Sequence, residues 1–237
     1  DKAVSLGHVK GAHTLTISTG SGNVTLASLG ETDTKLAALS ITTTGTKTAS
    51  GTWHIDSAVS TGALVLGGNL AITTSNDAIT LGAITGANDL SLTSGNGTIT
   101  LANIGTNAVD VGNLTLSTAA AVSAAGNWYV GNITGDEALT TTGALTVDAG
   151  SVDFANIVMG GNLSITSTST IDVGTVSGAK NLTLNSGNNG NITLGSVGTN
   201  AVPVNTVSIT PHGTGIISTS GNWFTNEAIA LGAVTPS

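Results

Sequence analysis

Few residues of this 237-residue chain could carry acid–base chemistry or bind a metal ion. It has no cysteine, which excludes thiol nucleophiles, thiol redox centres and cysteine metal sites. Asp136 and Glu137 are its only adjacent carboxylates, whereas glycoside hydrolysis needs two carboxyl groups about 5–10 Å apart. The histidines are dispersed along the chain, at His8, His13, His54 and His212. We therefore predict that the chain is not an enzyme and uses no metal ion or cofactor.

A more regular signal is a triplet of glycine, one variable residue and tryptophan, which occurs at residues 51–53, 126–128 and 221–223. An apolar residue stands two positions after the first two tryptophans, so it shares a strand face with the tryptophan. This spacing predicts core positions for Trp53, Trp128 and Trp223. The residues that follow them then point outward, and we expect them to form a ligand-binding strip if they lie along one side: His54, Tyr129 and Phe224. The alternative is that they only cover a strand–turn junction.

The elements that carry these triplets are predicted to be strands. Apolar residues come in pairs two positions apart, such as Leu90 and Leu92 or Ile99 and Leu101, with threonine or serine between them. Such alternation places one face in a core and the other in water. The pairs recur about every ten residues and are separated by Gly, Asn and Ser-Gly clusters, which are typical of turns. No window has the helical period, so we expect almost no helix.

The sequence also has a longer repeat, whose units begin near Val4, Ile79 and Ile171. Repeated β segments of this kind favour a parallel β-helix in which successive coils stack about 4.8 Å apart. We expect roughly ten to twelve coils of about 20 residues each, forming one shaft segment over residues 1–237, an internal piece of a larger protein. Asparagines aligned at the turns would form ladders. An antiparallel sandwich of hairpins is the alternative, because residues 94–97 and 186–190 resemble hairpin turns.

The net charge of the chain restricts the classes of molecule that it can bind. The chain has five lysines and no arginine against 13 carboxylates, and its formal net charge is −8 at pH 7. Nucleic-acid binding requires a basic face, so nucleic acid is not an expected partner. The apolar runs are short and interrupted, so we expect no membrane-spanning helix.

The repeats resemble those of filamentous haemagglutinin-like exoproteins, which are large bacterial surface adhesins secreted by the two-partner pathway, and of autotransporter passengers. The segments that carry the resemblance are residues 161–166, 181–187 and 191–195. The likeness covers nearly the whole chain and lies in the general pattern of the repeats, without a diagnostic motif. It implies a right-handed parallel β-helix, export to the cell surface or medium, and adhesion or scaffolding.

These observations predict a structural and adhesive shaft segment of a secreted or surface-exposed bacterial protein. Its partner would be a glycan or protein on a host or neighbouring cell, contacted by turn residues and outward aromatic residues. Uncapped end coils carry free backbone groups, so end-to-end self-association is also expected. Two other functions remain open: a β-helix enzyme that acts on polysaccharides, and ice binding by the threonine-rich runs.

Overall fold

The computed structural model describes residues 1–135 and 137–232, and these residues contain strands but no helix. The chain divides into two compact units, unit 1 (Asp1–Ala120) and unit 2 (Ala121–Ser237). Each unit is a β-solenoid of stacked parallel coils, and together they contain about 11 coils. The parallel β-helix prediction is therefore confirmed. The antiparallel sandwich is wrong, because the named strands pair in parallel throughout the described residues.

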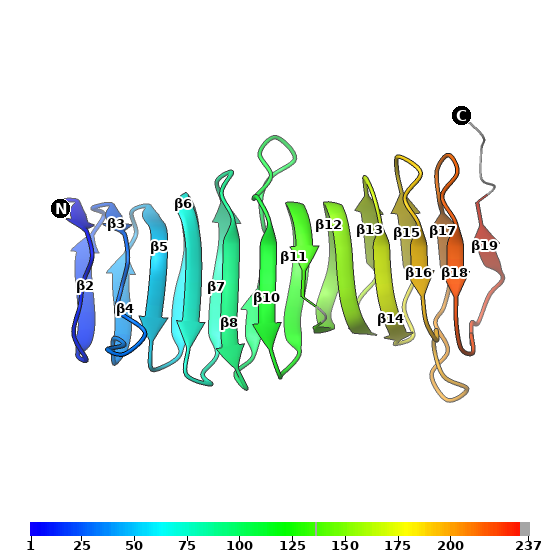
Figure 1. Cartoon of the computed structure of the whole chain (residues 1–237), viewed down its shortest axis with the longest axis horizontal. Coiled ribbons are helices and arrows are strands. Elements are labelled where there is room, and N and C mark those ends of the chain that lie inside the picture. The colour runs from blue at the N-terminus through cyan, green and yellow to red at the C-terminus, as the bar shows by residue number, and fades with distance from the viewer. Residues whose placement is uncertain (136, 233–237) are drawn as a thin grey trace. The chain divides into compact units, whose positions relative to one another are not determined.

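Unit 1 is built from ten strands. They are β1 (Val4–Leu6), β2 (Thr14–Gly20), β3 (Val24–Leu26), β4 (Ala38–Thr43), β5 (Lys47–Ile55), β6 (Val59–Thr74), β7 (Ile79–Thr85), β8 (Leu90–Gly95), β9 (Ile99–Leu101) and β10 (Leu114–Thr118). Figure 1 shows them in blue to green, stacked side by side in successive coils. β2 pairs with β4, and β6 pairs with both β7 and β8 because it continues through a corner of the coil.

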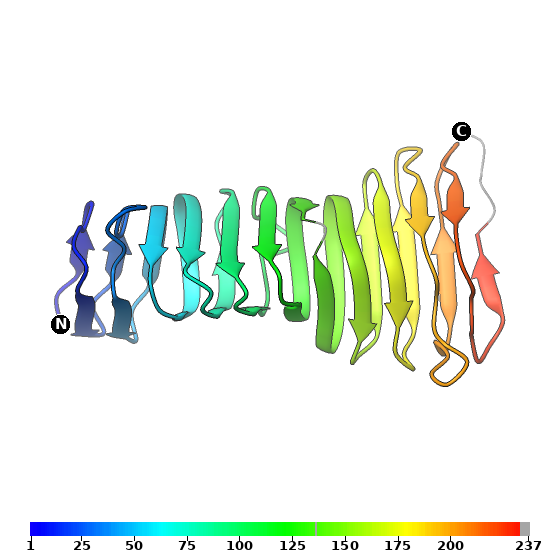
Figure 2. The same ribbon diagram turned by 60° about the horizontal axis from the view of Figure 1, so that its bottom comes forward.

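The described part of unit 2 contains nine strands. They are β11 (Val122–Thr134), β12 (Ala138–Met159), β13 (Leu163–Ser167), β14 (Ile171–Ser177), β15 (Leu182–Ser186), β16 (Ile192–Leu194), β17 (Val207–Thr210), β18 (Ile217–Thr219) and β19 (Ile229–Leu231). The stacking continues from β12 through β13, β15 and β17 to β19. The green to red strands in Figure 2 show this arrangement from a second side.

Residues that pair in successive coils form a column, and the inward columns make the core. In unit 1, the column of Trp53 contains Val9, Leu29, Ile72, Leu92 and Leu116. In unit 2, the column of Trp128 contains Val147, Ile165, Leu184, Ile209 and Leu231. Apolar side chains therefore stack on apolar side chains along the coil axis, and their removal from water is the main driving force for this fold.

Polar groups at the coil corners are satisfied locally. Inside the corners, the hydroxyl of Ser94 donates to the Gly97 carbonyl at 2.5 Å, and that of Ser186 donates to the Gly190 carbonyl at 2.6 Å. Among the described residues, every buried side-chain nitrogen and oxygen has a hydrogen-bond partner. Because an unpaired buried polar group costs about 1–3 kcal/mol, these bonds make the corners compatible with a closed core.

Asparagine side chains link the outer corners of adjacent coils. The Asn76 Oδ1 accepts a hydrogen bond from the backbone N–H of Asn96 at 3.1 Å, and the Asn162 Oδ1 accepts one from the N–H of Asn181 at 3.2 Å. These contacts differ from the predicted ladders of side-chain amides, because the amide oxygen accepts from the backbone of one adjacent coil. They fix the register of the turns without any charged side chain.

Candidate functional site

The most prominent departures from the regular coil are three loops, at residues 30–36 and 105–111 in unit 1 and 198–204 in unit 2. Each loop begins at a glycine whose φ is +67°, namely Gly30, Gly105 and Gly198. Each is closed by a reciprocal pair of backbone hydrogen bonds, as between Thr106 and Val109 at 2.9 and 3.0 Å. The loops therefore share one conformation, set by a left-handed glycine and a four-residue turn.

Two of these loops are closed at the base by a residue predicted to contact a ligand. The N–H of His54 donates to the Leu29 carbonyl at 2.7 Å, and the His54 carbonyl accepts from the N–H of Leu36 at 2.9 Å. In the same way, the N–H of Phe224 donates to the Val197 carbonyl at 2.7 Å, and the Phe224 carbonyl accepts from the N–H of Val204 at 3.0 Å. Because both ends of the loop bond to this one residue, its outward side chain stands beside the loop.

A tryptophan supports the base residue from the coil interior. The side chain of Trp53 is fully buried, and its Nε1–H donates to the Ala27 carbonyl at 2.7 Å. Trp128 is also fully buried. The side chain of Trp223 is only half-buried, although its Nε1–H donates to the Gly195 carbonyl at 2.9 Å. Trp53 and Trp223 therefore anchor the segments that pair with Leu29 and Val197, the residues just before two of the loops.

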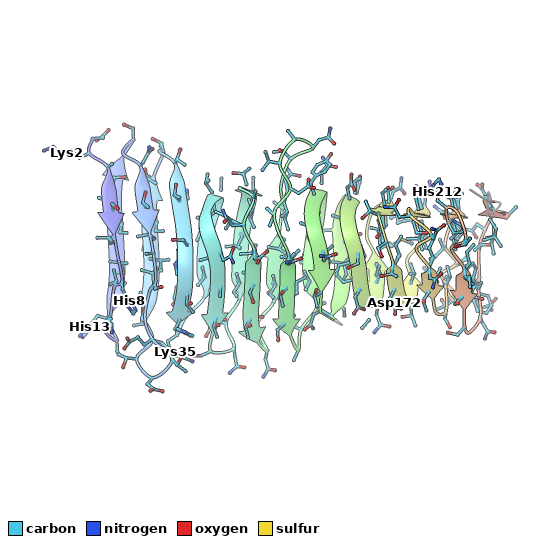
Figure 3. All side chains as sticks on the ribbon, turned by 45° about the horizontal axis from the view of Figure 1, so that its top comes forward. Lys2, His8, His13, Lys35, Asp172 and His212 are labelled. Carbon is cyan, nitrogen blue, oxygen red and sulfur yellow. The ribbon has the colours of Figure 1, made fainter. Side chains whose placement is uncertain are left out.

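The loop at residues 30–36 covers a polar hollow of about 390 Å³. The hollow is lined by two imidazoles, two carboxylates, three hydroxyl side chains and a glycine: His8, His54, Glu31, Asp33, Ser28, Thr32, Thr52 and Gly30. Figure 3 labels His8 and Lys35 on the first coils of unit 1. The hollow gathers two of the chain's four histidines at the base of one loop.

Charged and polar contacts hold the first half of this loop. The Lys10 ammonium forms an ion pair with the Glu31 carboxylate. The hydrogen bond from Lys10 lowers the pKa of Glu31 below its ordinary value, although desolvation partly opposes this effect. The charge interactions with Lys10 and His8 lower the pKa further by smaller amounts. The His8 Nε2 also lies 3.2 Å from the Gly30 carbonyl oxygen.

The second half of the loop is tied to the following coils. The Nζ of Lys35 donates to the Ser75 hydroxyl at 2.5 Å, and that hydroxyl donates to the Asp56 Oδ1 at 2.7 Å. The loop is therefore bonded to residues of three other coils, through Lys10, His54 and Ser75. A braced loop keeps the hollow open without a ligand, which lowers the ordering cost of binding.

The hollow is suited to hydrogen bonding. Imidazole, carboxylate and hydroxyl groups offer both donors and acceptors to a polar molecule. Among the described residues, no group of three or more His, Asp or Glu side chains is placed to hold a metal ion. Asp136, half of the adjacent acidic pair noted in the sequence, lies outside the described residues. In the described ranges 1–135 and 137–232, no helix has the length and apolarity needed to cross a membrane.

Two of the three outward residues, Tyr129 and Phe224, lie in unit 2 and can be compared there. His54 and Tyr129 are half-buried, and Phe224 has 36% of its surface exposed. In unit 2, Tyr129 belongs to a column with Asp148 and Thr166. Phe224 instead follows Trp223, whose column contains Val197, Val176 and Ile157. Tyr129 and Phe224 therefore project from different strand stacks of unit 2.

The loops themselves were not predicted from the sequence. A signal was present, because residues 105–109 and 198–202 both read Gly-Thr-Asn-Ala-Val. Val109 and Val202 are 46% and 44% exposed. An identical turn sequence with an exposed valine, repeated in two units, indicates a surface element rather than a core segment.

Comparison with protein-family models finds no match, and comparisons with curated proteins and with solved structures find none either. The observations on which a function can be based are therefore the solenoid fold, its loops and the residues at their bases.

Proposed function

We propose that this chain is a structural and adhesive shaft segment of a large bacterial surface or secreted protein of the filamentous haemagglutinin-like kind. The shaft would hold binding residues away from the cell, and its loops and outward side chains would contact a glycan or protein on a host or neighbouring cell. The observation that carries the proposal is the stacking of apolar side chains on apolar side chains along the coil axis of each unit. An apolar interior with hydrogen-bonded corners makes a stiff support that needs no cofactor or disulfide.

The arrangement of the loops supports an adhesive role. Loops positioned by a rigid scaffold commonly carry binding residues. Here they stand on buried strands, and His54 and Phe224 lie directly at their bases. Outward aromatic side chains such as Tyr129 and Phe224 provide large contact areas at low entropic cost.

Binding to cells tests the proposal. Fluorescent chain should bind mammalian epithelial cells or bacterial cells, and the double variant Tyr129→Ser, Phe224→Ser should bind at least fivefold less. Val158→Ser is the matched control, because it also removes an exposed apolar side chain of unit 2, and it should bind as the parent does. Far-ultraviolet circular dichroism should be the same for all three proteins. Absence of binding by the parent, or equal losses in the double variant and the control, would contradict the proposal.

A further inference from the structure

A second hollow in unit 1 differs from the loop site, because it is a groove that crosses successive coils. It has a volume of about 420 Å³ and involves β5, β6, β8 and β10. Its floor is a row of short outward side chains, Thr52, Ala71, Ser91 and Thr115, which pair in register from coil to coil. At about 4.8 Å per coil, this row extends roughly 14 Å along the coil axis.

One wall of the groove is a ladder of hydrogen bonds. The Asn69 Oδ1 accepts from the N–H of Asp89 at 3.0 Å, and the Asp89 Oδ1 accepts from the N–H of Asn113 at 2.8 Å. The side-chain amides of Asn69 and Asn113 also donate to Asp89, at 3.4 and 3.3 Å. The wall is therefore fixed before any ligand arrives and presents polar atoms at the spacing of the coils.

The chemistry of the groove restricts its ligand. Asp89 is the one charged residue in its lining, and both carboxylate oxygens accept hydrogen bonds from neighbouring asparagines. No lysine or histidine lines it to pair with an acidic ligand. Leu70 and Leu90 lie in the lining but are buried beneath the floor. The floor strands of β6 and β8 are paired on both edges, which prevents strand addition by a peptide.

From these features we infer that the groove binds a neutral linear polysaccharide that lies along the coil axis. Hydroxyl and amide groups repeated along a straight groove match a polymer whose hydroxyl groups also repeat, whereas a compact ligand would use only one coil. The ladder and the floor would donate to and accept from sugar hydroxyls. This inference rests on the proposed adhesive function and names one surface and one ligand class for it.

Filling the groove tests the inference. The probes are an array of neutral linear hexasaccharides (β-1,4-glucan, β-1,4-mannan and N-acetylglucosamine oligomers), with hyaluronan and heparin hexasaccharides as acidic counterparts. The parent chain should bind at least one neutral probe and neither acidic probe. Ala71→Trp should weaken that binding at least tenfold, because the indole would occupy the floor between Thr52 and Ser91. Thr80→Trp is the control, since Thr80 is an exposed outward residue of β7 outside the groove.

A second variant examines the charge argument without filling the groove. Asp89→Asn removes the carboxylate but keeps an oxygen that can accept from Asn113. Binding of the neutral probe should change less than threefold. A larger loss would contradict the assignment, because a neutral ligand gains no attraction from the negative charge and the variant keeps an oxygen that can accept from a sugar hydroxyl. Circular dichroism and the urea midpoint of each variant distinguish lost binding from lost structure.

The outcomes separate this inference from the proposed function. If a neutral probe binds and Ala71→Trp has no effect, while Tyr129→Ser and Phe224→Ser abolish binding, the groove is not the site and the adhesive function stands. Binding of acidic probes alone also overturns the groove inference. If no probe binds but cells do, the groove inference fails and adhesion stands. If neither probes nor cells bind, both proposals fail.

Discussion

Gly30 has a conformation and surroundings that permit no other residue without strain. Its φ is +67°, and a Cβ atom there would lie 2.3 Å from the His54 carbonyl oxygen and 2.8 Å from the Leu36 nitrogen. Both contacts are with backbone atoms that hold the loop closed. The junction between coil and loop is therefore specified by a single residue.

We predict that Gly30→Ala lowers the free energy of unfolding by about 1–3 kcal/mol, the usual cost of a strained backbone position. Gly7→Ala is the control, since no atom lies within 4 Å of the added Cβ there, and it should change stability by at most about 0.5 kcal/mol. Urea unfolding followed by circular dichroism measures both. Equal stabilities of the two variants would contradict the expected strain.

The ion pair between Lys10 and Glu31 predicts a pH dependence of the same loop. Because the folded protein holds the pKa of Glu31 below its ordinary value of 4.5, the contact stabilises the loop above that pH and is lost as the pH falls through the lowered pKa. Lys10→Met should raise the pKa of Glu31, whereas Lys2→Met should leave it unchanged. Titration of the Glu31 side-chain carboxyl carbon by nuclear magnetic resonance measures this. An unaltered midpoint in Lys10→Met would refute the assignment of the cause.

Among the strands, β5 shows how a buried aromatic residue supports its neighbours. Trp53 is enclosed between coils and donates to the Ala27 carbonyl. Trp53→Phe should therefore cost about 2–4 kcal/mol, from a residual cavity and an unpaired buried acceptor. Trp223→Phe should cost about 1 kcal/mol, because that half-buried side chain leaves its partner open to water. Urea midpoints compare the two, and a larger effect at Trp223 would contradict the explanation from burial.

The existence and the faces of the strands could be predicted because the information is local. Leu90 and Leu92 alternate with Ser91 and Thr93 in the sequence, and both leucines are fully buried in β8. The repeat of such segments was enough to favour parallel stacking. The predicted short strands were less accurate, since β6 and β12 have 16 and 22 residues. They continue through corners where glycine permits a bend, as at Gly62 with its φ of +64°.

The candidate site could not be predicted in the same way, because it depends on how many residues each coil uses. The column of Ser5 continues through Thr25, Thr48, Val65 and Thr85. Successive residues of this column are separated by 20, 23, 17 and 20 positions in the sequence. A loop in one coil and a tight corner in another cause the variation. Equivalent positions in the sequence, such as Tyr129 and Phe224, consequently need not share a column.

At the scale of the whole molecule, the 237-residue chain should associate through its terminal strands. Within the described residues, β18 pairs only with β16 and β19 only with β17. Ile229 and Leu231 of β19 are 38% and 59% exposed. A strand with a free edge is a template for pairing with another chain.

Sedimentation velocity should show a weight-average mass above 23.0 kDa that rises with protein concentration. Leu231→Lys should reduce this association, because charge on an edge strand opposes pairing. Val158→Lys, which alters an exposed residue of β12, should not. A monomer at all concentrations would exclude the association.

The length of the sequence repeat has one more consequence. Val4 and Ile79 begin equivalent units 75 residues apart. The column of Ser5 nevertheless continues to Thr85. The counterpart of Ser5 in the second unit, Thr80, lies in a different column, with Ser60 and Thr100. One sequence repeat is thus shorter than a whole number of coils, so equivalent residues of successive repeats lie in different columns. A gene that gained or lost one such repeat would rotate every later loop about the axis as well as lengthening or shortening the protein. Variation in repeat number would then change the direction in which the molecule presents its contacts, with no substitution in any of them.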